Sequence, residues 1–117
     1  MPNSGLNGPY PLAHEKIDAV VTRESPGAYI FGRASNGTFY VSYVGRSDSD
    51  VNRRLHEHVE EYPSFKFGYF PSPKPAFEKE CQLWHDFRGP EGELDNKNHP
   101  ARPEGTDWGC PVCDIFD

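Results

Sequence analysis

The sequence lacks long apolar runs and has little hydrophobic content overall. No segment approaches the roughly 18 to 20 consecutive apolar residues that cross a bilayer, and the N-terminus has no basic region followed by an apolar stretch. We therefore expect a cytoplasmic protein with no membrane partner. Hydrophobic residues make up only 35% of the 117 residues, which predicts one domain with a single modest core.

Cysteine and positive charge are also scarce. The three cysteines are odd in number, so a disulfide framework is not expected. The net charge is −6, whereas nucleic-acid binding normally uses a basic surface. Residues 1–58 carry six Lys/Arg and six Asp/Glu, and residues 59–117 carry six and twelve, so the acidic excess is C-terminal. Four arginines of the first half could form a local positive site or be scattered and solvated: Arg33, Arg46, Arg53 and Arg54.

Aromatic residues are plentiful, at 14% of the sequence, and they mark the expected strands. Residues 27–31 and 40–46 are rich in aromatic and β-branched side chains and flank Asn36-Gly37, a pair that tolerates the positive φ angles of a tight hairpin turn. Residues 65–70 alternate well enough to predict a third strand. The sequence thus predicts an α/β (α+β) domain with a three-stranded antiparallel sheet flanked by helices.

Two helices are expected to flank this sheet. Residues 47–50 offer several N-cap side chains, and apolar residues then recur at helical spacing, which predicts a helix over residues 50–62. A second helix is predicted over residues 76–87, because Pro75 suits a first helical turn and Gly89-Pro90 follows the end.

The two ends of the chain differ from this middle part. Residues 1–11 have no periodicity and are expected to form a mobile lead-in. Ile17, Val20 and Val21 mark a short ordered piece, either a helical turn or an edge strand. The expected division of the chain is a lead-in over residues 1–25, a domain over residues 26–98 and a C-terminal tail over residues 99–117.

The hairpin and the helix after it resemble the GIY-YIG nuclease family. Gly27-Ala28-Tyr29 stands where that family has Gly-Ile-Tyr, and Tyr43-Val44-Gly45 stands where it has Tyr-Ile-Gly. The following helix carries Arg54 and His58, where family members have an arginine and often a histidine. Residues 76–80 resemble the family's helix that bears the metal-binding glutamate.

The resemblance implies a divalent-metal-dependent endonuclease that hydrolyses DNA phosphodiester bonds, with residues 26–98 as the nuclease domain. Tyr29 would be the general base or would position the attacking water, and Tyr43 would belong to the same catalytic site. Arg54 would bind the phosphate through its planar guanidinium. His58 would assist proton transfer or orient the nucleophile.

The resemblance also implies a metal ligand and a late asparagine. Glu80 would hold one Mg²⁺ or Mn²⁺ through a carboxylate oxygen, and Asn96, or Asn98 as its alternative, would complete the catalytic set. Glu80 is preferred to Glu78 because it takes the family's glutamate position, whereas Glu78 would face solvent. Considered singly, the tyrosines would be packing residues, and Arg54 and Glu80 would be solvated helix charges.

Cysteines and histidines of the second half suggest another metal site. Cys110 and Cys113 have the spacing of a zinc knuckle. Cys81 and His85 lie four residues apart and so share a face of the predicted helix. These four residues predict a structural Zn²⁺ that would fix the tail to the helix, with His99 as a rival for the fourth ligand. The alternative is three reduced cysteines, one of them buried as a small hydrophobic residue.

Two classes of function therefore stay open for this chain. The first is the Mg²⁺-dependent endonuclease acting on DNA, for which a larger protein assembly could supply binding affinity. The second is a catalytically inactive, zinc-stabilised module that binds nucleic acid or protein. The negative net charge and the single carboxylate at the expected Mg²⁺ site favour the second class.

Overall fold

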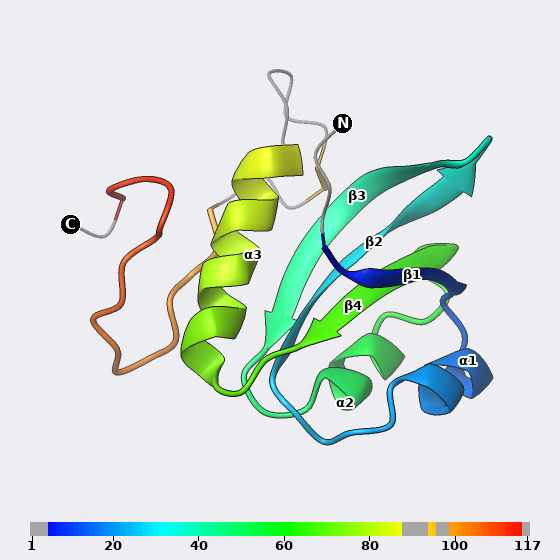
Figure 1. The fold of residues 1–117 in the computed structure, drawn as a ribbon, viewed down its shortest axis with the longest axis horizontal. Coiled ribbons are helices and arrows are strands. Elements are labelled where there is room, and N and C mark those ends of the chain that lie inside the picture. The colour runs from blue at the N-terminus through cyan, green and yellow to red at the C-terminus, as the bar shows by residue number, and fades with distance from the viewer. Residues whose placement is uncertain (1–4, 88–93, 96–98, 116–117) are drawn as a thin grey trace.

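The computed structural model describes residues 5–87, 94–95 and 99–115, which form an α+β fold with a four-stranded antiparallel sheet. The strands lie in the order β1-β4-β2-β3 and are β1 (Asn7–Pro11), β2 (Gly27–Ser35), β3 (Thr38–Ser47) and β4 (Ser64–Tyr69). The helices are α1 (His14–Val20), α2 (Val51–His56) and α3 (Pro73–Phe87) (Figure 1). Within the described ranges, no helix is both long and apolar enough to cross a membrane.

Strands β2 and β3 form the hairpin that the sequence predicts. Asn36 and Gly37 make the turn, with φ angles of 51° and 78°. Both angles lie in the left-handed region, which asparagine and glycine adopt more readily than other residues. Strand β4 then pairs antiparallel with β2, which confirms the third expected strand.

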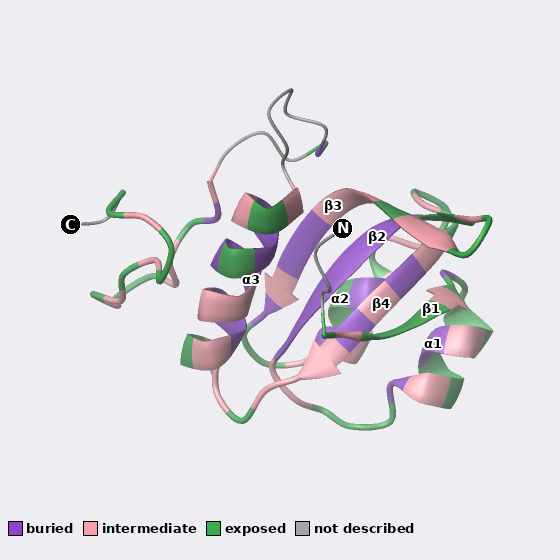
Figure 2. Cartoon of the chain, turned by 45° about the horizontal axis from the view of Figure 1, so that its top comes forward, coloured by how far each residue is buried: buried purple, intermediate pink, exposed green. Residues whose placement is uncertain are grey.

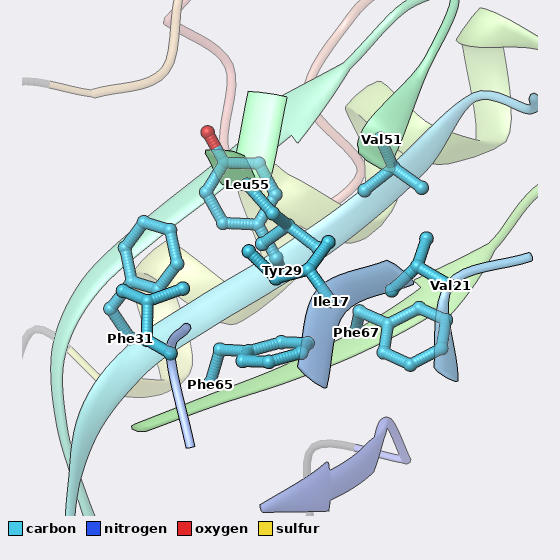
Figure 3. Packing of buried hydrophobic residues seen from close by; sticks show 9 residues of the cluster. Ile17, Val21, Tyr29, Phe31, Val51, Leu55, Phe65 and Phe67 are labelled. Carbon is cyan, nitrogen blue, oxygen red and sulfur yellow. The ribbon is translucent and has the colours of Figure 1, made fainter. Parts of the chain in front are cut away.

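Helices cover both faces of the sheet, so residues 27–32 of β2 are buried on both sides (Figure 2). Tyr29 and Phe31 face α1 and α2, whereas Ala28 and Ile30 face α3, because alternate side chains of a strand point to opposite faces. The first face holds an aromatic cluster (Figure 3), consisting of Leu12, Ile17, Val21, Tyr29, Phe31, Val51, Leu55, Phe65 and Phe67. The second face holds a smaller cluster of Ala28, Ile30, Val44, Leu83, Trp84 and Leu94.

The N-terminal residues differ from what the sequence suggested. Residues 7–11, expected to be mobile, form β1 and pair with β4, so the sheet has four strands and not three. Asparagine, glycine and proline are depleted in strands, so the composition of residues 7–11 did not indicate a strand. Prolines are nevertheless tolerated in a strand at the edge of a sheet. The segment around Ile17 is helix α1, and Ile17 is fully buried in the aromatic cluster.

Both expected helices form. The N-cap of α2 is Asp50, whose carboxylate accepts hydrogen bonds from the backbone N–H groups of Asn52 at 3.1 Å and Arg53 at 3.5 Å. Helix α3 begins at Pro73, earlier than the predicted start at residue 76. A proline is compatible with this first turn because the N–H groups there have no partner within the helix.

Helix α2 ends at His56, well before the predicted end at residue 62. The chain makes turns beyond it, and Glu60 has a φ of 77°, which a right-handed helix does not contain. Val59 and Tyr62 still pack against the aromatic cluster. Their helical spacing therefore reflected burial, but a turn rather than a helix brings them to the core.

Candidate functional site

A cleft of about 420 Å³ lies where the strands of the hairpin meet α2, α3 and the tail. It is lined by side chains from β2, β3, the loop before α2, α2 itself and α3, and by Ala101 of the tail. Four of the residues predicted to be catalytic line this cleft: Tyr29, Tyr43, Arg54 and Glu80. Asn96 and Asn98 lie outside the described residues.

Tyr29 is the most deeply buried of the cleft residues, with 1% of its surface exposed. Its ring belongs to the aromatic cluster, and its hydroxyl, the red atom in Figure 3, points away from the other side chains. Gly45 lies opposite in β3, where a Cβ atom would come within 2.5 Å of the Tyr29 ring. Glycine is required at position 45 because any side chain there would displace this tyrosine.

The protonation of Tyr29 follows from its surroundings. Burial raises the pKa of Tyr29, and the Arg54 guanidinium opposes this only in part. The hydroxyl is therefore protonated at neutral pH. It can donate a hydrogen bond to a water or a phosphate oxygen, but it is poorly suited to remove a proton.

Tyr43 and His58 lie beside Tyr29 without forming hydrogen bonds to it. The His58 ring centroid is 6.2 Å from that of Tyr29 and 5.6 Å from that of Tyr43. His58 Nδ1 lies 3.1 Å from Glu61 Oε1, which fixes the orientation of the imidazole. Although His58 is not among the residues that line the cleft, it contacts both tyrosines that do.

Three of the four arginines expected to form a positive site line the cleft, namely Arg46, Arg53 and Arg54. Arg54 is about half exposed, and its Nη1 lies 3.4 Å from Glu57 Oε1. Such an exposed pair is weak and can open for an incoming anion. The fourth arginine, Arg33, instead lies over the ring of Tyr40, with 5.4 Å between guanidinium carbon and ring centroid.

Glu80 projects from α3 and is paired with an arginine. It is 8% exposed, and its Oε1 accepts a hydrogen bond from Arg46 Nη1 at 2.5 Å. The same Nη1 also donates to the carbonyl oxygen of Ala101 at 2.7 Å, and Arg46 Nε donates to Asp48 Oδ1 at 2.8 Å. Burial raises the pKa of Glu80, and Arg46 opposes the rise because it stabilises the carboxylate.

The contact between Arg46 and Glu80 was not predicted from the sequence. The two residues are distant in the chain, and they meet because α3 packs on β2 and β3. One signal was available, since Arg46 directly follows Gly45 at the end of the second tripeptide. Arg46 pairs with Ala28, which faces α3, so alternation along the strand directs the Arg46 side chain toward α3 and Glu80.

A separate group of ligand atoms lies between α3 and the tail. One atom each from His85, His99, Cys110 and Cys113 can be chosen so that all four lie within 4.8 Å of one another. This group could hold a metal ion such as zinc, because two thiolates and two imidazoles are a common tetrahedral zinc set. Burial acts to raise the pKa of Cys110, but the backbone N–H groups of Val112 and Cys113 lower it to about 7, which favours the thiolate.

This group contains His99, the rival fourth ligand, and does not contain Cys81. Cys81 is fully buried on α3, and burial raises the pKa of its thiol, with the neighbouring Cys110 adding to the rise. The Trp84 ring contacts the His85 and His99 rings edge-on, at 5.0 Å and 5.2 Å between centroids. Helical spacing alone could not show that the tail returns to α3 at His99.

The cleft therefore gathers three guanidinium groups, two tyrosine hydroxyls, the buried carboxylate of Glu80 and three less buried carboxylates, from Asp48, Asp50 and Glu57. Guanidinium groups bind phosphate oxygens, and a carboxylate facing a polar cleft can hold a divalent cation. Comparison with protein-family models, curated proteins and solved structures found no match for the chain, so its function is inferred from this geometry.

Proposed function

We propose that this chain is a divalent-metal-dependent endonuclease that hydrolyses DNA phosphodiester bonds in the cleft. The observation that carries the proposal is the convergence of Tyr29, Tyr43, Arg54 and Glu80 on one cleft. They come from two strands and two helices, and all four line the same cleft although they lie far apart in the chain. Their order along the chain also matches the GIY-YIG resemblance.

Hydrolysis of a phosphodiester needs a positioned water and neutralisation of the negative charge that develops in the transition state. Arg54 would bind two phosphate oxygens through its guanidinium, which is half exposed in the cleft. Tyr29, protonated and fixed by burial, would orient the water through its hydroxyl. His58, whose imidazole contacts both tyrosines, would assist proton transfer or orient the nucleophile.

The divalent cation would be held by Glu80. Its carboxylate is a hard oxygen ligand inside the cleft, as Mg²⁺ and Mn²⁺ require, and water and phosphate would supply the remaining ligands. When bound, the cation would neutralise charge on the phosphate. Arg46 already contacts one Glu80 oxygen, so the second oxygen is the one that remains for a cation.

We further propose that zinc occupies the group formed by His85, His99, Cys110 and Cys113. Sulfur ligands disfavour Mg²⁺ and favour zinc. One ligand comes from α3 and three from the tail, so the metal would fix the tail to the body of the fold. Its role would be structural, since all four tetrahedral positions would be filled by protein.

Two observations favour a module that binds without cutting. Glu80 is paired with Arg46 in the same cleft, and the chain carries a net charge of −6. In that case the arginines would bind a phosphate group of nucleic acid or protein, and no cation would enter. DNA affinity for either function could come from a larger assembly.

The decisive experiment is a cleavage assay on labelled duplex, single-stranded and branched DNA with Mg²⁺, Mn²⁺ or a chelator. We expect cleavage only with a divalent cation. Glu80→Gln should abolish it in protein that still folds, since the amide keeps the shape of the side chain and can still accept from Arg46. The matched control is Glu78→Gln on the same helix, which should cut normally. Full activity in Glu80→Gln would refute the metal role, and DNA binding without any cleavage would favour the binding module.

A further inference from the structure

We infer that the metal group of the tail positions Arg46 in the cleft, so that zinc controls one wall of the proposed catalytic site. This rests on the zinc site proposed above and is independent of whether the cleft cuts DNA. Arg46 would act as a positioning residue. Its guanidinium is the point where the tail, β3 and α3 meet.

The tail reaches the cleft within two residues of a metal ligand. His99 belongs to the metal group, Pro100 is buried, and the carbonyl oxygen of Ala101 accepts a hydrogen bond from Arg46 Nη1 at 2.7 Å. Ala101 also lines the cleft. The ring of Pro100 fixes one of the few backbone dihedral angles between them, so a shift of His99 is expected to move the Ala101 carbonyl as well.

The metal group is also connected to Arg46 through α3. Glu80 and His85 lie on this one helix, which holds them at a fixed separation. Arg46 Nη1 donates to Glu80 Oε1 as well as to Ala101. A metal joining His85 to His99 would therefore close a ring of contacts that includes both the metal group and the guanidinium in the cleft.

Besides the metal group, the described part of the tail is held there by Pro100, by the contact of the Trp84 ring with His99 and by the Ala101 carbonyl. Among the described residues 99–115, Pro100 is the buried one, and the others are intermediate or exposed. The Trp108 ring lies 6.4 Å from that of Phe77, which is a loose contact. Loss of the metal should therefore release Ala101, remove one acceptor from Arg46 and open the cleft on that side.

The first test follows the Arg46 side chain by NMR in arginine-labelled protein of measured zinc content. Arg46 Nε–H donates to Asp48, and the side chain is largely buried, so it should exchange slowly with solvent when zinc is bound. Chelation of zinc should speed this exchange by at least about tenfold, as expected for a local opening. Arg54, which is exposed on α2, is the internal control and should not change.

The second test uses reciprocity, since two coupled sites must affect each other equally. Arg46→Lys keeps a positive charge beside Glu80 but loses the planar guanidinium group, whose N–H groups contact several acceptors. It should weaken zinc binding about fivefold or more in competition with a chelating dye, within the usual range of coupling between sites. Arg53→Lys, in the same cleft, is the matched control and should bind zinc normally.

The outcomes separate the proposals. This inference would be overturned if the Arg46 Nε–H exchanged with solvent at the same rate with and without zinc. Equal zinc affinity in Arg46→Lys and Arg53→Lys would also overturn it. A chain that binds no zinc would overturn the zinc site and the inference together. Failure to cleave DNA would count against the nuclease alone.

Discussion

The body of the protein, residues 5–87, and its tail, residues 99–115, are held together by different physical means. The body buries an aromatic cluster on one face of the sheet and a second cluster on the other. The described part of the tail contains no helix or strand and buries little beyond Pro100, but it supplies three of the four atoms of the metal group. Burial spreads stability over many contacts, whereas a metal concentrates it in a few bonds. The two regions should therefore respond to different perturbations.

The largest expected effect is removal of the metal. A structural zinc contributes on the order of 10 kcal/mol of apparent binding free energy near neutral pH, far more than the loose contacts of the tail. Chelation should abolish amide protection from residue 99 onward and leave the hairpin and α2 protected, as measured by hydrogen exchange. Purified protein should contain about one zinc per chain.

Ligand substitutions make this first test specific. His99→Ala and Cys113→Ser should each lose zinc, whereas Cys81→Ala should retain it, because Cys81 is not in the metal group. Elemental analysis of the three variants is the measurement. Zinc loss in Cys81→Ala with full zinc in His99→Ala would restore the ligand set first predicted from the sequence.

The next largest effect is expected in the body. Phe65 is fully buried in the aromatic cluster, so Phe65→Ala should lower the free energy of unfolding by about 3 to 5 kcal/mol. Chemical denaturation measures this loss, and the folded variant should keep its zinc. Tyr40, which is 48% exposed, provides a control, since Tyr40→Ala should cost less than about 1 kcal/mol. Equal effects of both variants would contradict a body stabilised by burial.

A smaller effect is expected in the cleft, where the two regions meet. Arg54→Lys keeps the charge and loses the planar fork, so cleavage should slow by about 10²-fold, as when one donor to a transition-state oxyanion is lost. Folding and zinc content should not change, since the Arg54 side chain is exposed. Single-turnover cleavage rates provide the measurement. A near-normal rate would mean that only the charge of Arg54 matters.

The smallest effect is expected at the start of α2. Asp50→Ala removes the carboxylate that caps this helix and should cost about 1 kcal/mol of stability. Asp50→Asn can still cap and serves as the control. Hydrogen exchange should show faster opening of α2 with no change in the tail, because Asp50 has no part in the metal group. Faster hydrogen exchange in the tail of Asp50→Ala would show that the stability of the tail depends on that of the body.

Local signals in the sequence predicted the local structure well. Asn36-Gly37 specifies its own turn, and Asp50 caps α2 through groups only two and three residues away. Strand β1 was missed because it forms only by pairing with β4, which lies far along the chain. Composition cannot reveal a strand whose stability comes from its partner.

The same limit applies to the candidate site. Tyr29 and Arg54 could be placed from the tripeptide and the helix that follows it, and both line the cleft. The pairing of Arg46 with Glu80 and the return of His99 to α3 depend on how distant segments pack. Spacing along the chain contains no information on such contacts.

The position of β1 at the edge of the sheet has a practical consequence for anyone who shortens this chain. A fragment starting at residue 26, as the resemblance suggests, would lose both β1 and α1. The hydrogen-bonding edge of β4 would then face water, and Phe65 and Phe67 would lose the cover of Leu12 and Ile17. An exposed aromatic edge strand pairs readily with other chains. Such a fragment should aggregate during purification even if every residue of the cleft is retained.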